Sequence, residues 1–268
     1  MEKAKSLDCD AIIFDLEDAV AADAKAKARE QVALAVNGGG YGHRELIVRI
    51  NGLDTPWGKD DLAVAAELPV QALLFPKVES ADQVAQIISA TDDSGGGTLP
   101  VWVMIETPTG VLDVREVAAA SDRVQCLVMG TSDLVKELRA AHTPSRANLA
   151  FALQSCVLAA REAGIDVLDG VHLDFRNLDS FRAACEQGRA MGFDGKTLIH
   201  PSQVEGANEA FGYGSDEIED ARAVLEVWAV AQAEGKGVAV LDGRLIENLH
   251  AAEAERVLAF AEALAARG

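Results

Sequence analysis

Short apolar runs alternate with longer amphipathic segments along almost the whole chain. Runs without polar alternation are typical of buried parallel strands, because both faces of such strands are covered. The longer segments carry apolar residues at helical spacing. Repeated strand–helix units of this kind predict a parallel α/β sheet, either closed as a barrel or doubly wound. The strands expected from the pattern are residues 11–14, 45–50, 72–78, 100–106, 126–133, 166–174 and 195–200.

Charged side chains stand at or near the end of each expected strand. In a TIM barrel these ends converge on one mouth where the chemistry lies, whereas a doubly wound sheet concentrates its site at one switch point. The even distribution of charge favours the barrel, although seven strands are found instead of eight. The residues concerned are Glu17, Arg49, Lys77, Glu106, Asp133, Asp174 and His200.

Composition narrows the class of protein. A length of 268 residues suits one large α/β domain or a domain with a small appendage, and 49% apolar residues are ample for a core. The formal charge of −19 argues against nucleic acid and anionic membranes as partners. The four cysteines lack zinc or disulfide spacing, and no segment has the pattern of a signal peptide or membrane span. We therefore expect a soluble, cytoplasmic protein.

The first strand ends abruptly in the carboxylates Asp15, Glu17 and Asp18. In extended chain, Asp15 and Glu17 point to the same side. Crowded carboxylates at the end of a buried strand repel one another unless a cation or basic group lies among them. Favourable interaction with the dipole of the next helix would explain Asp18 and part of Glu17, but it leaves Asp15 unexplained. A functional cluster is the better interpretation.

Glu106 and Asp133 are isolated acids, each ending an otherwise apolar expected strand. Mg²⁺ is usually bound by one or two carboxylates, with the remaining positions left to water and substrate oxygens. The planar guanidinium of Arg49 is suited to a small carboxylate. Each residue alone is equally well explained by a structural ion pair. Their joint pattern predicts a magnesium site for an oxo-acid, whereas His172 is better explained as a core histidine than as a ligand.

Six motifs carry a family resemblance, and they occur in the family's order over nearly the whole chain. The chain resembles the citrate lyase β-subunit and malyl-CoA lyase family of (β/α)8 acyl-CoA lyases, and within it the branch that contains malyl-CoA thioesterases. The motifs are DLEDAV at 15–20, VRINGLDTPWG at 48–58, PKVES at 76–80, ETPTG at 106–110, MGTSDL at 129–134 and GKTLIHPSQ at 195–203.

The resemblance implies a role for each residue of the mouth. Glu106 and Asp133 would bind Mg²⁺ or Mn²⁺, and Arg49 would hold the oxo-acid. Glu17 and Asp18 would hold metal-bound waters and Arg49. The remaining substrate contacts would come from the backbone of Gly130, Thr131 and Ser132, and from Lys77, for which an ion-pairing role or one facing CoA is expected.

The sequence departs from the family at both ends. Family members begin with a strand that precedes the present first helix, so the barrel is expected to lack its first strand, through a truncated or mis-assigned start. We expect a catalytic barrel at residues 1–212 and a helical tail at 213–268. In the family this tail packs on a neighbouring subunit of a homotrimer or homohexamer and delivers an aspartate, and Glu247 takes that place here.

The function expected from this combination is Mg²⁺-dependent cleavage or formation of a carboxylated 3-hydroxyacyl-CoA such as malyl-CoA. The products would be an oxo-acid and an acyl-CoA enolate that Glu247 protonates. One alternative is hydrolysis of the same thioester, with Glu247 as base. Another is a non-catalytic subunit that binds oxo-acids or serves assembly. The sequence leaves the choice among malyl, methylmalyl, citramalyl and citryl thioesters open, and between CoA and an acyl-carrier protein.

Overall fold

The structure is a computed structural model that describes residues 1–267. The chain divides into two compact units, Met1–Phe211 and a C-terminal unit that begins at Gly212. Among residues 1–267, no helix has both the length and the apolar character needed to cross a lipid bilayer.

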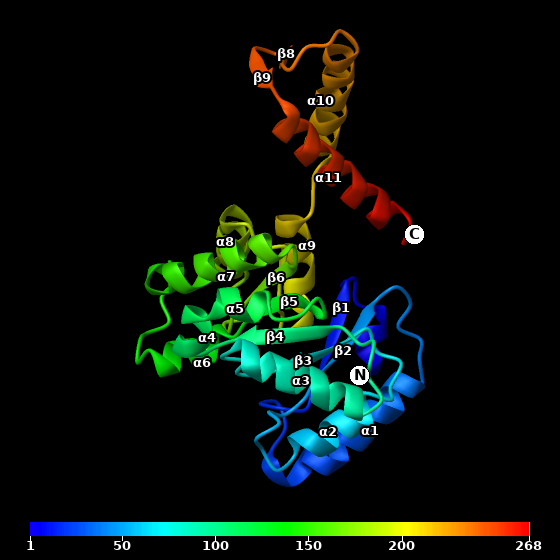
Figure 1. Cartoon of the computed structure of the whole chain (residues 1–268), viewed down its shortest axis with the longest axis vertical. Helices are drawn as coiled ribbons and strands as arrows, with labels where there is room; N and C mark the ends of the chain where they lie inside the picture. The colour runs from blue at the N-terminus through cyan, green and yellow to red at the C-terminus, as the bar shows by residue number, and fades with distance from the viewer. Residues whose placement is uncertain (268) are drawn as a thin grey trace. The chain divides into compact units, whose positions relative to one another are not determined.

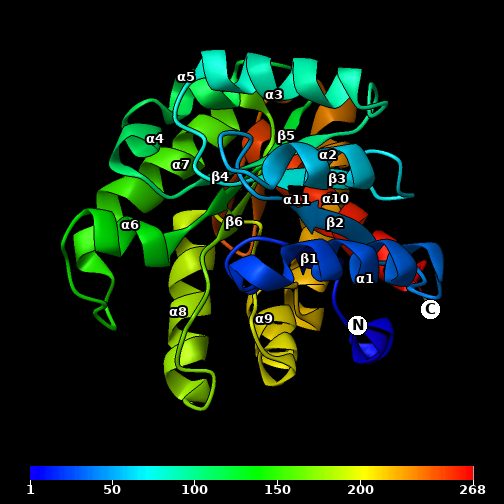
Figure 2. The same ribbon diagram turned by 90° about the horizontal axis from the view of Figure 1, so that it is seen from below.

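The first unit is built on one parallel sheet whose strands follow one another in chain order, so that β1 and β7 form its two edges. The sheet curls into a partial barrel, with helices on its outer side (Figures 1 and 2). This confirms the expected barrel architecture without its first strand. The strands are β1 (Ala11–Asp15), β2 (Glu45–Arg49), β3 (Ala72–Phe75), β4 (Val101–Ile105), β5 (Val124–Met129), β6 (Asp166–Asp169) and β7 (Gly195–Lys196).

Alternation along the strands separates two cores. One set of strand residues, including Val48, Leu73 and Leu127, packs against the helices. The other set, including Ile47 and Leu74, forms a smaller apolar cluster on the opposite face. The α-helices of this unit are α1 (Lys25–Asn37), α2 (Gly58–Ala65), α3 (Ala81–Asp93), α4 (Pro108–Leu112), α5 (Val114–Ala118), α6 (Thr131–Glu137), α7 (Ala150–Ala163), α8 (Leu178–Met191) and α9 (Val204–Phe211).

Four strands end three or more residues earlier than expected from the sequence, and the first of them, β3, ends at Phe75 instead of residue 78. Strand β5 ends at Met129, and Asp133 lies in the first turn of α6 instead of on the strand. Gly130 ends the strand in a sharp turn, and an acid in a first helical turn is favoured by the helix dipole. Strands β6 and β7 end at Asp169 and Lys196, so the segments 170–174 and 197–200 are loops and short turns.

The C-terminal unit consists of α10 (Ser215–Ala233), a hairpin of β8 (Ala239–Leu241) and β9 (Arg244–Ile246), and α11 (Asn248–Ala265). Trp228, Ile246 and Val257 belong to its separate core. The hairpin was not expected from the sequence. Its turn has positive φ at Asp242 (48°) and Gly243 (78°), which is the backbone that an Asp-Gly hairpin turn adopts.

Candidate active site

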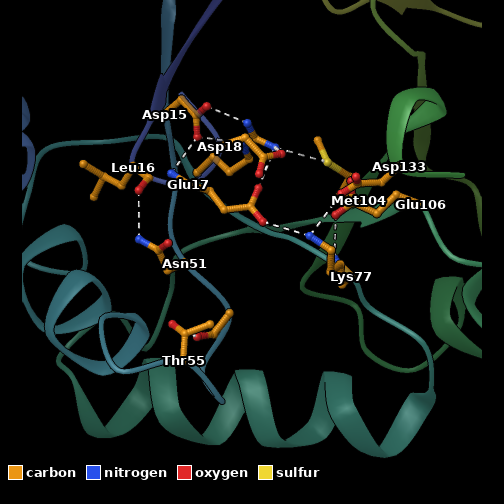
Figure 3. Close-up of polar contacts among 12 residues, drawn as sticks. Asp15, Leu16, Glu17, Asp18, Asn51, Thr55, Lys77, Met104, Glu106 and Asp133 are labelled. Atoms are coloured by element: carbon orange, nitrogen blue, oxygen red, sulfur yellow. Dashed lines mark hydrogen bonds and ion pairs between the residues drawn. The ribbon is translucent and has the colours of Figure 1, made fainter. Parts of the chain in front are cut away.

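Strand periodicity brings the predicted site residues to one face of the sheet. Ile13, Ile47 and Met104 belong to the smaller core, and side chains two residues later on a strand point to the same side. Asp15, Arg49 and Glu106 therefore follow on that face at the carboxyl ends of β1, β2 and β4. Figure 3 shows Asp15 on one side of the site and Lys77, Glu106 and Asp133 on the other, with Glu17 joined to Lys77 between them.

Arg49 is held by Asp15, the acid that helix-dipole effects left unexplained. The two residues are register partners in the sheet. Arg49 Nε and Nη2 lie 2.7 and 2.5 Å from Asp15 Oδ1 and Oδ2, and the same carboxylate accepts the N–H groups of Glu17 and Ala19. Burial alone would raise the pKa of Asp15, but hydrogen bonds and charge from Arg49 lower it below its usual value. Asp15 is therefore ionised and fixes the guanidinium.

Glu17 lies between two cations. Its Oε2 is 2.7 Å from Arg49 Nη1, and its Oε1 is 3.2 Å from Lys77 Nζ. Burial raises its pKa more than these neighbours lower it. Asp18 is more distant, with 3.6 Å to Arg49 Nη1 and a side chain that is 63% exposed. The structure thus places Glu17 in direct contact with Arg49 and leaves Asp18 at the rim.

Lys77 joins the cluster through both backbone and side chain. It follows β3 with φ of 51°, a left-handed conformation that is uncommon outside glycine. Its N–H donates to Glu106 Oε1 at 2.9 Å, and its Nζ lies 3.1 Å from Asp133 Oδ2. Burial would lower its pKa, but Asp133 and Glu17 raise it above its usual value. The Lys77 ammonium is therefore charged and neutralises part of the acidic cluster.

Glu106 is only 2% exposed and packs directly against the turn after β5. A Cβ atom at Gly130 would lie 2.3 Å from Glu106 Cβ, so that only glycine permits this approach. Burial, with the negative charge of Glu17, raises the pKa of Glu106 to about 7. The ionised form of such a carboxylate is disfavoured, and a nearby cation would stabilise it strongly.

The turn that carries Asp133 is packed as closely. Thr131 is buried, and a Cβ at Gly170 would lie 2.5 Å from its Oγ1. Among residues 1–267, Ser132 Oγ is one of few buried side-chain atoms without a hydrogen-bond partner. Leaving a buried hydroxyl without a hydrogen bond costs free energy, so Ser132 is a candidate contact for a polar ligand.

The carboxylates of Glu106 and Asp133 fit Mg²⁺. Both are hard oxygen donors, and both contact Lys77. Residues 1–267 contain no group of three or more His, Cys, Asp or Glu side chains arranged to hold a metal. Mg²⁺ needs only one or two protein carboxylates, with water and substrate oxygens at the other positions. Burial, together with the charge of Glu17, raises the pKa of Glu106, so a cation bound beside this carboxylate would stabilise its ionised form.

Other predicted residues lie elsewhere. Glu247 belongs to the C-terminal unit, where it precedes α11 and its N–H donates to His250 Nδ1 at 3.0 Å. His172 Nε2 lies 2.9 Å from Ser180 Oγ, in agreement with a satisfied histidine. Sequence reasoning missed the buried Lys25, whose contacts with the turn after β1 are described below.

Comparison with known proteins gives consistent results. The sequence profile of the family described as HpcH/HpaI aldolase/citrate lyase matches residues 1–201. A protein named (3S)-malyl-CoA thioesterase from Cereibacter sphaeroides is 48% identical over 268 residues, covering 100% of this chain and 92% of the relative. The citrate lyase subunit beta of Escherichia coli is 35% identical over 259 residues, covering 94% and 86%.

Solved structures show the same fold. The protein CitE from Mycobacterium tuberculosis, in complex with magnesium, acetoacetate and coenzyme A, has a TM-score of 0.76 at 29% identity, covering 95% of this chain and 90% of that chain. A citrate lyase from Burkholderia xenovorans has a TM-score of 0.83 at 20% identity, covering 95% and 84%. The profile and the relatives together establish that this chain belongs to the HpcH/HpaI aldolase/citrate lyase family.

Proposed function

We propose that this protein is a Mg²⁺-dependent enzyme that hydrolyses the thioester of a carboxylated 3-hydroxyacyl-CoA, (3S)-malyl-CoA being the first candidate. The observation that carries the proposal is the pair of the buried Glu106 and the partly exposed Asp133, both in contact with Lys77, on the sheet face that also carries the fixed cation Arg49. The 48% identity to proteins named (3S)-malyl-CoA thioesterase favours hydrolysis over carbon–carbon cleavage.

Glu106 and Asp133 would hold the Mg²⁺, which when bound supplies a Lewis acid for oxygen atoms of the substrate. Arg49 provides a permanent positive charge for the substrate carboxylate. Because Asp15 already occupies its Nε and Nη2, Arg49 would bind the substrate with its remaining N–H groups. The unpaired Ser132 hydroxyl and the backbone of Gly130 and Thr131 are further candidate contacts for the same carboxylate.

The other predicted roles belong to residues outside the carboxylate pair. We propose that Glu247 accepts a proton from the attacking water, because its place in the motif DGRLIENLH matches that of the family's acid. Glu17 and Asp18 would hold metal-bound waters, Glu17 also fixing Arg49. Lys77 would pair with the acidic cluster or face the CoA.

Carbon–carbon cleavage is the second candidate, favoured by the identity of 35% to a citrate lyase β subunit. The same carboxylate pair and Arg49 would then hold the oxo-acid formed from the substrate. Glu247 would give its proton to the enolate carbon of the acyl-CoA, instead of taking one from water.

The products distinguish the candidates. With malyl-CoA and Mg²⁺, hydrolysis yields malate and free CoA in equal amounts, whereas lyase activity yields glyoxylate and acetyl-CoA. Malate and CoA without glyoxylate are expected. Glu106→Gln and Asp133→Asn should each lose the activity while keeping the fold, because a neutral amide does not balance a divalent charge. Full activity in a chelator or in either variant would overturn the metal site, and glyoxylate as the main product would overturn hydrolysis.

A further inference from the structure

A buried lysine that the proposed chemistry does not use lies beneath the acidic turn after β1. Lys25 is the first residue of α1 and is only 6% exposed. Its Nζ donates to the backbone oxygens of Leu16 and Glu17 at 2.9 and 2.7 Å, and to Asn51 Oδ1 at 2.8 Å. These three contacts use all three ammonium protons, so the side chain has one defined position.

Asn51 also hydrogen-bonds to the backbone of this turn. Its Nδ2 donates to the Leu16 oxygen at 2.8 Å, a contact drawn in Figure 3, and to Asp61 Oδ2 at 2.5 Å. Asp61 is fully buried and accepts from Arg29 Nε at 2.7 Å. Helices α1 and α2 are thus connected to the turn through polar groups that are satisfied by one another. Networks of this kind rigidify the segment they hold.

The turn held by Lys25 and Asn51 sets the direction of the Glu17 side chain. Leu16 N–H donates to the Arg49 backbone oxygen at 2.8 Å, which ties the turn to the end of β2. From the backbone held by Lys25, the Glu17 side chain reaches Arg49 Nη1 and Lys77 Nζ. Because burying an ammonium group is costly, a lysine used only to start a helix would be expected at the surface.

We infer that Lys25 is a positioning residue of the active site: it fixes the Leu16–Glu17 backbone so that Glu17 holds Arg49 and Lys77 in place for the substrate. The effect on substrate rests on the proposed function, whereas the effect on the turn does not. The opposite interpretation is that Lys25 only stabilises the fold, and two experiments separate them.

The first experiment measures amide hydrogen exchange in Lys25→Met, with Lys27→Met as the matched control from the exposed side of α1. Exchange of the Glu17 and Ala19 amides, which donate to Asp15, is expected to accelerate about tenfold or more in Lys25→Met alone. The amides of β4 should keep their protection. Unchanged exchange at Glu17 and Ala19 would overturn the inference. If amide exchange accelerates throughout the protein in Lys25→Met, the experiment is repeated with Lys25→Gln, which keeps a hydrogen-bond donor. The same acceleration at Glu17 and Ala19 is then expected.

The second experiment is a double-mutant cycle with Glu17, read as the Kd of malate in the presence of Mg²⁺. Lys25→Met is expected to weaken binding about tenfold in the wild-type background and less than about twofold in Glu17→Gln, because the lysine acts through Glu17. If Lys25→Met raised the Kd of malate by the same factor in both backgrounds, the effect would be a general structural one and the inference would be overturned. If the wild-type protein binds no malate, the proposed function fails and the exchange experiment decides the inference alone.

Discussion

Lys77 places its positive charge within the acidic cluster. Its Nζ contacts Asp133 and Glu17, and its left-handed backbone brings its N–H to Glu106. Left-handed non-glycine residues tend to persist where the surrounding structure fixes them, often at functional sites. The ammonium and a metal ion would therefore compete for the same Asp133 carboxylate.

Lys77→Met is accordingly expected to tighten Mg²⁺ binding about two- to fivefold, the range that a half-exposed ion pair accounts for. The carboxylate that the ammonium neutralises becomes available to the metal, while the backbone contact to Glu106 is retained. Titration calorimetry of the metal-free protein measures the change. Lys136→Met, on the exposed side of the helix that carries Asp133, is the control and should bind as the wild type does. Weaker binding in Lys77→Met would show that the lysine organises the ligands instead.

Glu106 gives Mg²⁺ binding a pH dependence near neutrality. Its pKa is raised to about 7, and the metal binds only the ionised form. Below pH 7 a proton must leave before the metal binds, so the Kd for Mg²⁺ should rise by up to about tenfold for each unit of pH. Calorimetry in buffers of different ionisation enthalpy should detect release of a proton on binding. A Kd independent of pH between 5.5 and 7.5 would contradict this result.

The raised pKa of Glu106 also changes the free energy of unfolding with pH. The change has the opposite sign to that of a salt-bridged carboxylate, whose pKa is lowered. Between its usual value of 4.5 and about 7, the folded protein holds a proton on Glu106 that the unfolded chain has released. The metal-free protein should therefore lose roughly 1–3 kcal/mol of unfolding free energy as pH rises through this window. Denaturant titrations in chelator should show a smaller loss for Glu106→Gln, which has no proton to release.

At the scale of strands, the sequence predicted the sheet because buried parallel strands are apolar on both faces. It placed Glu106 and Arg49 correctly at strand ends, since each follows a continuous apolar run. It placed Asp133 wrongly on β5, because the polar segment 130–133 was counted with the strand although the apolar run ends at Met129. It also missed the β8–β9 hairpin, although Asp-Gly between two short apolar segments is a known turn signal.

Contacts between distant segments were beyond the sequence pattern. The pairing of Asp15 with Arg49 depends on the register of β1 against β2, which local periodicity does not specify. Lys25 was missed because a lysine at the start of an amphipathic helix is normally solvated. Its burial follows only from the position of Asn51 and the carbonyls of the turn.

The turn between β5 and α6 depends on Gly130. A methyl group there would come within 2.3 Å of Glu106 Cβ and 2.4 Å of its Oε2. Gly130→Ala should therefore displace the Glu106 carboxylate, weaken Mg²⁺ binding at least about tenfold and cost ~1–3 kcal/mol of unfolding free energy. Metal titration and chemical denaturation measure both effects. Gly97→Ala is the control, because the nearest atom to its new Cβ lies 3.9 Å away. Wild-type binding in Gly130→Ala would mean that the turn adjusts freely.

At the scale of the molecule, the C-terminal unit has a core of its own and an apolar hairpin surface. Val240 and Leu245 are cross-strand partners that are 66% and 53% exposed, and Leu249 nearby in sequence is 65% exposed. Clustered exposed apolar residues are typical of interaction sites. Glu247 lies between these residues in sequence. We propose that this surface packs on a neighbouring subunit of a trimer or hexamer and carries Glu247 to its site.

A shared site predicts complementation between inactive variants. Arg49→Ala lacks the fixed cation of the first unit, and Glu247→Ala lacks the acid of the C-terminal unit, so each alone should be inactive. Mixed oligomers contain some sites that combine an intact first unit with an intact C-terminal unit from the other chain. Co-expression of the two, with different tags to purify only mixed oligomers, should therefore restore about a third of the wild-type activity in a trimer and about a quarter in a hexamer if subunits mix at random. Arg49→Ala mixed with Glu17→Gln is the control and should stay inactive, because every first unit is then defective. Purified mixed oligomers without activity would show that Glu247 acts within its own chain, whereas full activity of Glu247→Ala alone would show that Glu247 takes no part in the reaction.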